Sequence, residues 1–327
     1  MLKHILVVAL ALFPCCTLCD SLSAQAAPQR EIAITIDDLP AGNANNMTAA
    51  DITAMTKKLL ATVREQKVPA VGFANERKIY KTGEADERIA SLNMWLDNGF
   101  ELGNHTFSHT SLNNVPLQVW EEEVIRGEVL TKLLLAQHHM KMRYFRHPYL
   151  DTGRDLQTRR SAEAFLYQRG YQIAPITMDA WDWAYAGVYE DARKRGDTEL
   201  QNRLVTSYLQ HTTEVFDYFE KLSRDLFGYE PKQILLLHGN WLEADHIGEL
   251  FDLLRKRGYK FVTLEEALSD TAYSSPDEYV GPEGSSWLEH WAITRGKPPL
   301  NEPVFPQWVL DKSAALPHSG PEPQIFY

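Results

Sequence analysis

The sequence predicts an α/β fold, a distorted (β/α) barrel of about seven parallel strands. Short apolar runs alternate with longer stretches of helical periodicity, and this alternation favours a parallel sheet. Three helical stretches end in the same way, with a glycine followed by an aromatic residue, at residues 98–100, 169–171 and 257–259. Because glycine readily adopts the left-handed conformation that ends a helix, the recurrence predicts repeated helix-to-strand units.

The first strand is expected over residues 31–37, which are apolar on nearly both faces, as a strand buried in a parallel sheet is. Further strands are predicted at residues 68–73, 100–102, 144–145, 171–176, 234–237 and 261–264. Among the helices, Thr48 followed by Asp51 resembles a capping box. Pro116 suits the first turn of a helix that continues through Leu135.

One catalytic domain is expected over residues 31–270, because a chain of 327 residues, 44% hydrophobic and 24% charged, is long enough for one large core. Residues 184–231 are predicted to be a helical insertion packed against the barrel, with apolar residues at helical spacing: Leu200, Leu204, Tyr208, Val215, Phe219, Leu222 and Leu226. Residues 271–327 form a proline-rich extension, in which Trp287, Leu288 and Trp291 could anchor a short helix. Its aromatic residues either line a sugar-binding groove or, the interpretation we favour, cover apolar surface.

Residues 1–26 are predicted to be a secretory signal peptide. Lys3 precedes a short apolar run, and Ala24-Gln25-Ala26 offers a cleavage site between small residues. The expected location is therefore exported, either periplasmic or secreted. All three cysteines lie in this segment, so in the processed chain any metal must be held by histidine and carboxylates. Lipid attachment at Cys15 or Cys19 is the less favoured alternative.

The net negative charge of the chain excludes some classes of binding partner. With 33 basic and 44 acidic residues the net charge is −11, which argues against nucleic acid or an anionic membrane. No segment after the leader approaches the roughly 20 apolar residues that a membrane span needs. A neutral substrate fits better, and no protein partner is evident.

Unusual polar residues follow the predicted strands. They are Asp37 and Asp38 after the first, His105 and His109 after the third, Arg146 after the fourth, Asp179 and Asp182 after the fifth, and His238 after the sixth. In parallel α/β folds the carboxyl ends of the strands form one face, and that face hosts active sites. These residues are therefore expected to converge.

Two of these motifs together indicate a metal site. His105 and His109 are four residues apart, so on one helical turn both imidazoles would project to the same side. The pair alone is a weak signal. Two adjacent carboxylates at the end of an apolar strand repel each other unless a cation compensates them. Two histidines and one aspartate also leave a coordination position open, as catalytic rather than structural zinc sites do.

Five motifs, in order, resemble those of the polysaccharide deacetylases of carbohydrate esterase family 4, the NodB homology group. They are Thr35-Ile36-Asp37-Asp38, His105-Thr106-Phe107-Ser108-His109, Arg146-His147-Pro148-Tyr149, Asp179-Ala180-Trp181-Asp182-Trp183 and Leu236-Leu237-His238. The resemblance covers about residues 31–270, and five ordered motifs are far more specific than one.

The resemblance implies a role for each matched residue. Asp38, His105 and His109 would bind one divalent metal ion, with zinc expected. Asp37 would be the general base, paired with Arg146, and His238 the general acid, oriented by Asp182. The backbone amide at Tyr149 would stabilise the oxyanion. Pro148, Trp183 and Leu236 would contact the substrate, Trp183 as a groove wall and Leu236 at the acetyl methyl group.

The implied function is metal-dependent hydrolysis of N-acetyl groups on an amino-sugar polysaccharide or oligosaccharide of the peptidoglycan or chitin type, which is hydrolysis of a linear amide. Two alternatives stay open. One is an esterase that removes O-acetyl groups from a plant-type polysaccharide, and the other is a carbohydrate-binding protein without activity.

Several residues depart from the family pattern, and several histidines are expected to have no role in the site. His147 within the third motif, Gly239 and Asn240 after the fifth, the helical insertion and the extension have no counterpart that we can assign. His138 and His139 are expected to be a surface pair late in a helix, and His211 and His246 are expected to be solvated.

Overall fold

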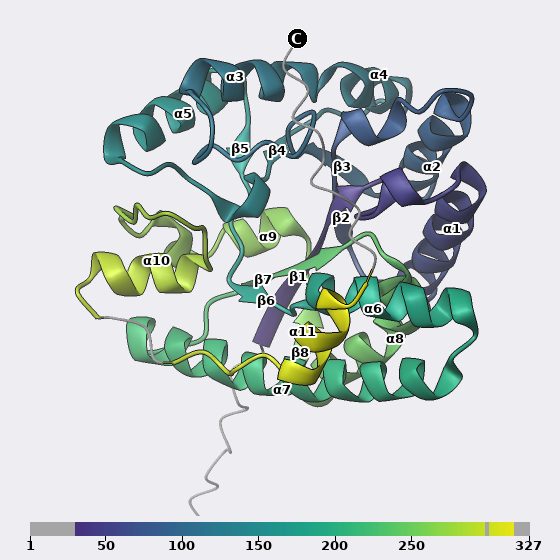
Figure 1. Ribbon diagram of the computed structural model, residues 1–327. Coiled ribbons are helices and arrows are strands. Elements are labelled where there is room, and N and C mark those ends of the chain that lie inside the picture. The colour runs from purple at the N-terminus through teal and green to yellow at the C-terminus, as the bar shows by residue number, and fades with distance from the viewer. Residues whose placement is uncertain (1–29, 298–300, 317–327) are drawn as a thin grey trace, which may run out of the picture.

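The computed structural model describes residues 30–297 and 301–316, so the predicted leader lies outside the described residues. A curled sheet of parallel strands forms the centre, and helices surround it (Figure 1). The strands are β1 (Arg30–Leu39), β2 (Ala70–Ala74), β3 (Glu101–Asn104), β4 (Tyr144–Phe145), β5 (Gln172–Ile173), β6 (Met178–Asp179), β7 (Gln233–His238) and β8 (Tyr259–Phe261).

Seven strands lie in the order β5-β4-β3-β2-β1-β7-β6, and β8 pairs separately with the first residues of β1. Every recorded pairing is parallel. Within the described residues no pairing joins β5 to β6, so the barrel stays open there. The predicted fold class is confirmed. The two-residue strand β6 was not predicted, because so short a run has no periodicity to recognise.

The helices that cover the sheet are α1 (Ala49–Glu65), α2 (Ala85–Asp97), α3 (Leu117–Arg126), α4 (Val129–Gln137), α5 (Leu156–Gln168), α6 (Asp182–Arg195), α7 (Thr198–Phe227), α8 (Trp241–Lys256) and α9 (Leu264–Leu268). Helices α10 (Trp287–Thr294) and α11 (Gln307–Ala314) follow in the C-terminal segment. Short 3-10 turns are η1 (Ala44–Asn46), η2 (Glu76–Ile79), η3 (Pro148–Leu150) and η4 (Thr271–Ser274). No helix in the described part of the chain is long and apolar enough to span a membrane.

The glycines predicted to end three helices have left-handed backbones. Their φ angles are 80° at Gly99, 82° at Gly170 and 87° at Gly258, and β3, β5 and β8 each begin within two residues. At the start of α1, the Thr48 side chain accepts a hydrogen bond from the Asp51 amide, as expected. Local chain signals therefore set these element ends.

The single helix predicted from Pro116 through Leu135 is wrong, because α3 ends at Arg126 and α4 begins at Val129. Gly127 lies at the break. A β-carbon there would stand 2.6 Å from the backbone nitrogen of Phe107, closer than real β-carbons come to backbone atoms. The glycine thus lets the helix pair approach the loop that carries His105 and His109.

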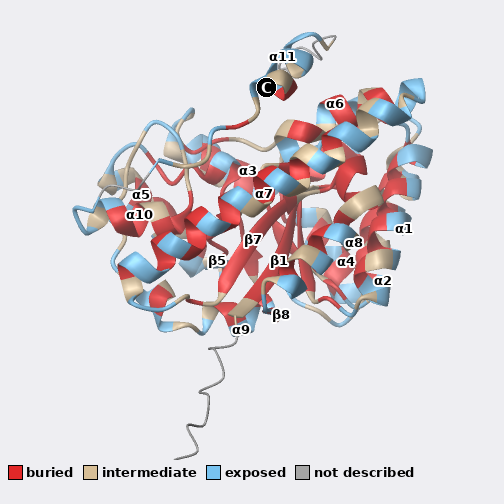
Figure 2. Ribbon diagram, turned by 90° about the horizontal axis from the view of Figure 1, so that it is seen from below, coloured by how far each residue is buried: buried red, intermediate tan, exposed pale blue. Residues whose placement is uncertain are grey.

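Buried residues occupy the strands of the sheet and the inward faces of the helices, with β1 and β7 at the centre (Figure 2). The stretch predicted as a helical insertion holds most of α6 and all of α7. Six of its seven spaced apolar residues are buried, and Leu200 is half-buried. In the C-terminal segment, Trp287 and Trp291 are buried within α10, consistent with tryptophans that cover apolar surface.

Candidate active site

The first and fifth motifs meet at the carboxyl ends of two neighbouring strands. Strand β1 pairs with β7 over six consecutive residues, and the last partners in that register are Asp37 and His238. Both are at the strand ends that the topology places on one face of the sheet. The predicted convergence of these two motifs is observed.

Asp38, His105 and His109 come together as the one group of three described acidic, histidine or cysteine side chains that could hold a metal ion. One ligand atom from each lies within 4.8 Å of the others. The His109 Nε2 to Asp38 Oδ1 distance is 3.6 Å, and the His105 Nε2 to Asp38 Oδ1 distance is 4.0 Å. The His105 Nε2 atom is also 3.7 Å from Asp37 Oδ2.

The prediction that the two histidines share a helical turn is wrong. Residues 105–111 form an irregular loop after β3, with left-handed backbones at Thr106 (φ 60°) and His109 (φ 59°). Buried Asn75 and Asn104 side chains hold the loop, since Asn75 donates to the His105 carbonyl and Asn104 accepts from the Thr106 amide. Loop geometry, rather than helical spacing, turns both rings toward Asp38.

The protonation of the two rings suits metal binding. His105 Nδ1 lies 2.8 Å from the Arg146 carbonyl, so Nδ1–H donates and the Nε2 lone pair points toward the carboxylates. Burial lowers the pKa of His109 to about 4 and holds the pKa of His105 well below its usual value. Neutral imidazoles are the form that binds a metal. One carboxylate and two such nitrogens therefore fit a divalent ion of the zinc type.

Lys78, from η2, is a neighbour that the sequence did not reveal. Its buried ammonium group lies 2.9 Å from Asp38 Oδ1. Burial favours the neutral form of Asp38, but Lys78, His109 and His105 together hold its pKa well below the usual value. A carboxylate offers about four lone-pair sites, so Lys78 and a metal ion can share Asp38.

Arg146 is completely buried and binds the other carboxylate of the first motif. Its guanidinium donates to Asp37 at 3.1 Å, to the Thr35 hydroxyl at 3.0 Å and to the Ala174 carbonyl at 2.6 Å. Burial raises the pKa of Asp37 to about 6, and Arg146 acts in the opposite direction. The arginine thus orients Asp37 and favours its ionised form.

His238 and Asp182 form a second pair. The Nδ1 of His238 lies 2.9 Å from Asp182 Oδ1. Burial opposes the charge on the ring, yet Asp182, with smaller contributions from Asp38 and Asp37, raises the pKa of His238 to about 10. His238 is therefore an imidazolium at neutral pH, able to donate a proton.

Asn240 completes this pair, although the motifs assign it no role. Its side-chain amide donates to Asp182 Oδ2 at 2.6 Å, and its side-chain carbonyl accepts the Glu243 amide at the start of α8. The same Asp182 oxygen accepts the backbone amide of His238. An N-cap asparagine was the signal available in the sequence, but it does not reveal the second contact.

The third motif forms η3 beside the histidines. The Tyr149 ring lies 4.3 Å, between centroids, from the His109 ring, and 61% of Tyr149 is exposed. Left-handed backbones recur at the motifs, at Asp38, Thr106, His109, Tyr149, Leu150 and Trp181. Non-glycine residues rarely adopt this conformation, and such strain concentrates at functional sites.

The remaining predicted substrate contacts flank these groups. Leu236 and Pro148 are buried, whereas Trp183 is 52% exposed at the start of α6. Leu236 lies opposite Thr35 in the pairing of β7 with β1, two residues before His238. Trp183 follows Asp182 directly in the sequence, and its exposed indole stacks on Trp181.

The histidines outside the motifs do not join the site. His138 and His139 lie at the end of α4, as expected, and His246 is partly exposed and hydrogen-bonded to Tyr189. The prediction for His211 is wrong, because it is 2% exposed and packs edge-on against Trp181 and Phe305. The C-terminal segment, which covers this part of α7, could not be placed from helical spacing.

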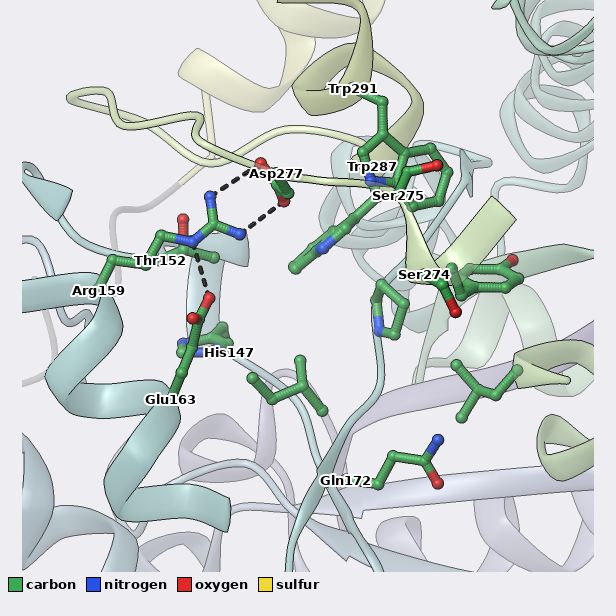
Figure 3. Close-up of a pocket in the computed structure, with 14 residues that line it drawn as sticks. His147, Thr152, Arg159, Glu163, Gln172, Ser274, Ser275, Asp277, Trp287 and Trp291 are labelled. Atoms are coloured by element: carbon green, nitrogen blue, oxygen red, sulfur yellow. Dashed lines mark hydrogen bonds and ion pairs between the residues drawn. The ribbon is translucent and has the colours of Figure 1, made fainter. Parts of the chain in front are cut away.

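His147 lines a separate cavity of about 330 Å³ between α5, β5 and the C-terminal segment (Figure 3). Arg159 from α5 spans it and binds Asp277 through two nitrogen–oxygen contacts of 2.9 and 2.6 Å. His147 stacks on Trp120, and burial lowers its pKa to about 3. The His147 ring is buried, and the residues that line the cavity include none of the metal-binding group.

Comparison with known proteins supports one family. Residues 24–169 match the family model described as polysaccharide deacetylase. That range includes the first three motifs, so the resemblance noted in the sequence is confirmed. A search of curated proteins finds no significant match.

A search of solved structures finds one neighbour with a TM-score of 0.50, which resembles the chain in fold, and others with lower scores. One is a mutant of a Bacillus anthracis pseudoenzyme of carbohydrate esterase family 4 with restored enzymatic activity, at 17% identity and a TM-score of 0.50, covering 74% of this chain and 68% of that one. A family 4 carbohydrate esterase from Streptomyces lividans, in complex with acetate, has 19% identity and a TM-score of 0.45 over 74% and 97% of the two chains. The peptidoglycan deacetylase PdaC from Bacillus subtilis has 20% identity and a TM-score of 0.45 over 73% and 92%.

Proposed function

Because residues 24–169 match the polysaccharide deacetylase family model, we propose that the chain is a metal-dependent hydrolase that removes N-acetyl groups from an amino-sugar polysaccharide or oligosaccharide. The proposal rests mainly on one observation: a set of possible metal ligands lies next to a carboxylate and an imidazolium that could act as base and acid. A metal-binding set of Asp38, His105 and His109 lies beside a buried base, Asp37, whose register partner on the next strand is the protonated His238.

The proposed reaction needs a base, a charge-stabilising group and an acid. A divalent ion held by Asp38 and the two histidines would polarise the acetyl carbonyl and lower the pKa of water toward ~7. Asp37, held by Arg146, takes the proton from the attacking water. The backbone amide at Tyr149 is assigned to the oxyanion, where one donor contributes several kcal/mol.

Collapse of the tetrahedral adduct breaks the carbon–nitrogen bond and releases acetate and an amine. An amine is a poor leaving group until it is protonated, so His238 donates its Nε2 proton to the nitrogen. Asp182 keeps the ring charged and fixes its orientation through the 2.9 Å contact at Nδ1. The presence of a strongly held proton donor is the feature that favours amide over ester hydrolysis.

Two alternatives remain to be distinguished. Removal of O-acetyl groups would use the same base and metal ion, but an alcohol departs with much less help from an acid. A carbohydrate-binding protein without activity is the other, and the solved structures include a pseudoenzyme. Against it, this chain retains Asp37 with its Arg146 partner and His238 with its Asp182 partner, and a binding protein has no chemical need of these pairs.

The location and the metal belong to the same proposal. We propose zinc, because one carboxylate and two neutral imidazoles with an open position match its catalytic sites. We also propose export to the periplasm or the medium, since the sequence before Ala27 has the charge, apolar run and small residues of a signal peptide. N-terminal sequencing of the purified protein tests cleavage near Ala27, and a mature chain that retains Cys19 would point instead to lipid attachment or a retained anchor.

The test of the reaction is product analysis on matched substrates. The protein is incubated with N-acetylated chitin fragments, with N-acetylated peptidoglycan fragments and with O-acetylated xylan fragments, and free amine and acetate are measured. Release of amine with equal acetate from an amino-sugar substrate is expected. Acetate release from the xylan fragments alone would favour the esterase, and no release from any substrate would favour the binding protein.

A further inference from the structure

The C-terminal segment reaches the edge of the candidate active site through three stacked aromatic rings. Trp181 lies between Trp183 and Phe305, with a ring-centroid distance of 5.5 Å and an interplanar angle of 25° on each side. Trp181 and Trp183 flank Asp182 in the sequence, whereas Phe305 comes from the stretch just before α11. The stack therefore joins a segment far along the chain to the residues around the proposed acid.

Hydrogen bonds to two carboxylates fix Trp181. Its Nε1–H donates to Glu302 Oε1 at 3.0 Å, and its backbone amide donates to Asp179 Oδ1 at 2.8 Å. Because the indole N–H is engaged, the Trp181 ring cannot turn without losing a hydrogen bond, and Trp183 stacks on a ring that is held in place.

The backbone beneath the stack is strained. Trp181 has φ 57° and ψ 23°, a left-handed conformation that a tryptophan rarely adopts. Surrounding contacts must stabilise it, and Phe305, which is 8% exposed and also packs on Tyr185 and His211, supplies much of that packing. The next residue is Asp182, the partner of His238.

The outer ring of the stack faces solvent. Trp181 covers one side of the Trp183 indole, and 52% of Trp183 remains exposed. An exposed indole held rigidly on a polar rim is a surface suited to the C–H face of a pyranose ring, because its π face packs against weakly positive C–H groups. A fixed ring also binds at a lower cost in side-chain entropy than a mobile one.

We propose that Glu302 and Phe305 of the C-terminal segment are positioning residues for carbohydrate binding, which hold Trp181 so that Trp183 presents one fixed face to a sugar ring. The inference rests on the proposed function in taking a carbohydrate as the substrate. It adds a role for a segment outside the five motifs and predicts that this segment sets substrate affinity.

The test is calorimetric titration with two neutral probes, N-acetylchitopentaose and xylopentaose, of metal-loaded protein that carries Asp37→Asn so that the probe is bound but not hydrolysed. Phe305→Ala and Glu302→Ala should each weaken binding of the preferred probe by roughly two- to tenfold, the range for one lost aromatic contact or one side chain that must be ordered again. Trp183→Ala should weaken it at least as much. Phe305→Tyr and Glu302→Gln, which keep a ring and a hydrogen-bond acceptor, should restore most of the affinity.

Val304 provides the matched control, since it lies between the two positions and is 89% exposed. Val304→Ala should bind the probe like the unaltered protein. In turnover of the N-acetylated probe, the Glu302→Ala and Phe305→Ala variants should raise KM by more than they lower kcat, a split that a general loss of folded protein would not produce.

Three results would overturn the inference: unchanged binding in Phe305→Ala and Glu302→Ala, equal weakening in Val304→Ala, or no dependence of binding on Trp183. Failure of this inference can be distinguished from failure of the proposed deacetylase function. Probe binding that depends on Phe305 without any acetyl release would remove the deacetylase and keep the positioning role. Deacetylation with an unchanged KM in Phe305→Ala would support the deacetylase and rule out the positioning role of Phe305.

Discussion

Asp37 and His238 are register partners at the ends of β1 and β7, and each has a buried ionic partner of its own. Arg146 holds the carboxylate and Asp182 holds the imidazole. The two groups that the proposed reaction needs as base and acid are thus placed by adjacent strands rather than by mobile loops. Their separate partners keep one ionised and the other protonated.

Replacing Asp37 by asparagine should separate catalysis from metal binding. A side-chain amide at this position cannot accept the proton, so turnover should fall by at least the ~100-fold typical of a general base. The metal content should stay near about one ion per chain, because Asp38 and both histidines remain. Metal analysis beside steady-state kinetics checks this. Loss of the metal from Asp37→Asn would show that Asp37 is itself a ligand.

Removing a proposed metal ligand should lower the metal content as well as the activity. Asp38→Ala and His109→Ala should lose both bound metal and activity, because two remaining ligands hold a divalent ion far more weakly than three. His246→Ala is the matched control, as this histidine lies outside the group. Full metal occupancy in Asp38→Ala would contradict the ligand assignment.

Loss of His238 should slow amide cleavage more than ester cleavage. His238→Ala removes the proton donor that an amine leaving group requires and that an activated acetyl ester needs much less. Because Asp182 acts through His238, the double variant His238→Ala, Asp182→Asn should be little worse than the worse single one. Rates on an N-acetyl oligosaccharide and an activated acetyl ester are compared in parallel. Equal slowing of both substrates, or additive losses, would rule out His238 as the acid.

The ion pair that anchors the C-terminal segment should make stability depend on pH. Burial would raise the pKa of Asp277, but its hydrogen bonds to His290 and Arg159 lower it to about 2. A carboxyl with a depressed pKa stabilises the fold above its unfolded pKa of about 4, and that contribution is lost as the pH falls toward 2. At neutral pH Asp277→Asn should therefore cost about 2 kcal/mol.

Denaturant unfolding of both proteins at several pH values measures this difference. The gap between wild type and Asp277→Asn should narrow steadily as the pH falls from about 4 toward 2, because the unfolded wild-type chain binds a proton at Asp277 over that range and the folded chain does not. A gap of the same size at every pH would mean that Asp277 stabilises the segment by shape or neutral hydrogen bonds alone.

The parts of the fold with strong local signals could be predicted from the sequence. Strand β1 is apolar on nearly both faces, and Gly99, Gly170 and Gly258 end helices in the left-handed conformation that glycine readily adopts. The break between α3 and α4 could not be predicted, because Gly127 is there to admit a loop from elsewhere in the chain. Tertiary contact, rather than helix propensity, decides that position.

The candidate site also has features that could be predicted from the sequence and features that could not. Ordered motifs were enough to identify the residues at the strand ends, but not the loop conformation that turns His105 and His109 together. Lys78 and Asn240 lie in segments that look like ordinary polar connections, and only the folded chain brings them to Asp38 and Asp182. Their roles depend on a single long-range contact, which leaves no periodicity or spacing in the sequence.

The most direct test of metal-dependent N-deacetylation is to measure the masses of N-acetylated chitin and peptidoglycan fragments after incubation with the protein. Samples are compared as purified, after metal removal by a chelator, and after zinc is restored. We expect a loss of acetyl groups that stops on chelation and returns with zinc. Acetyl loss that persists without metal, or intact N-acetyl groups in the zinc-loaded sample, would show that the proposed reaction is wrong.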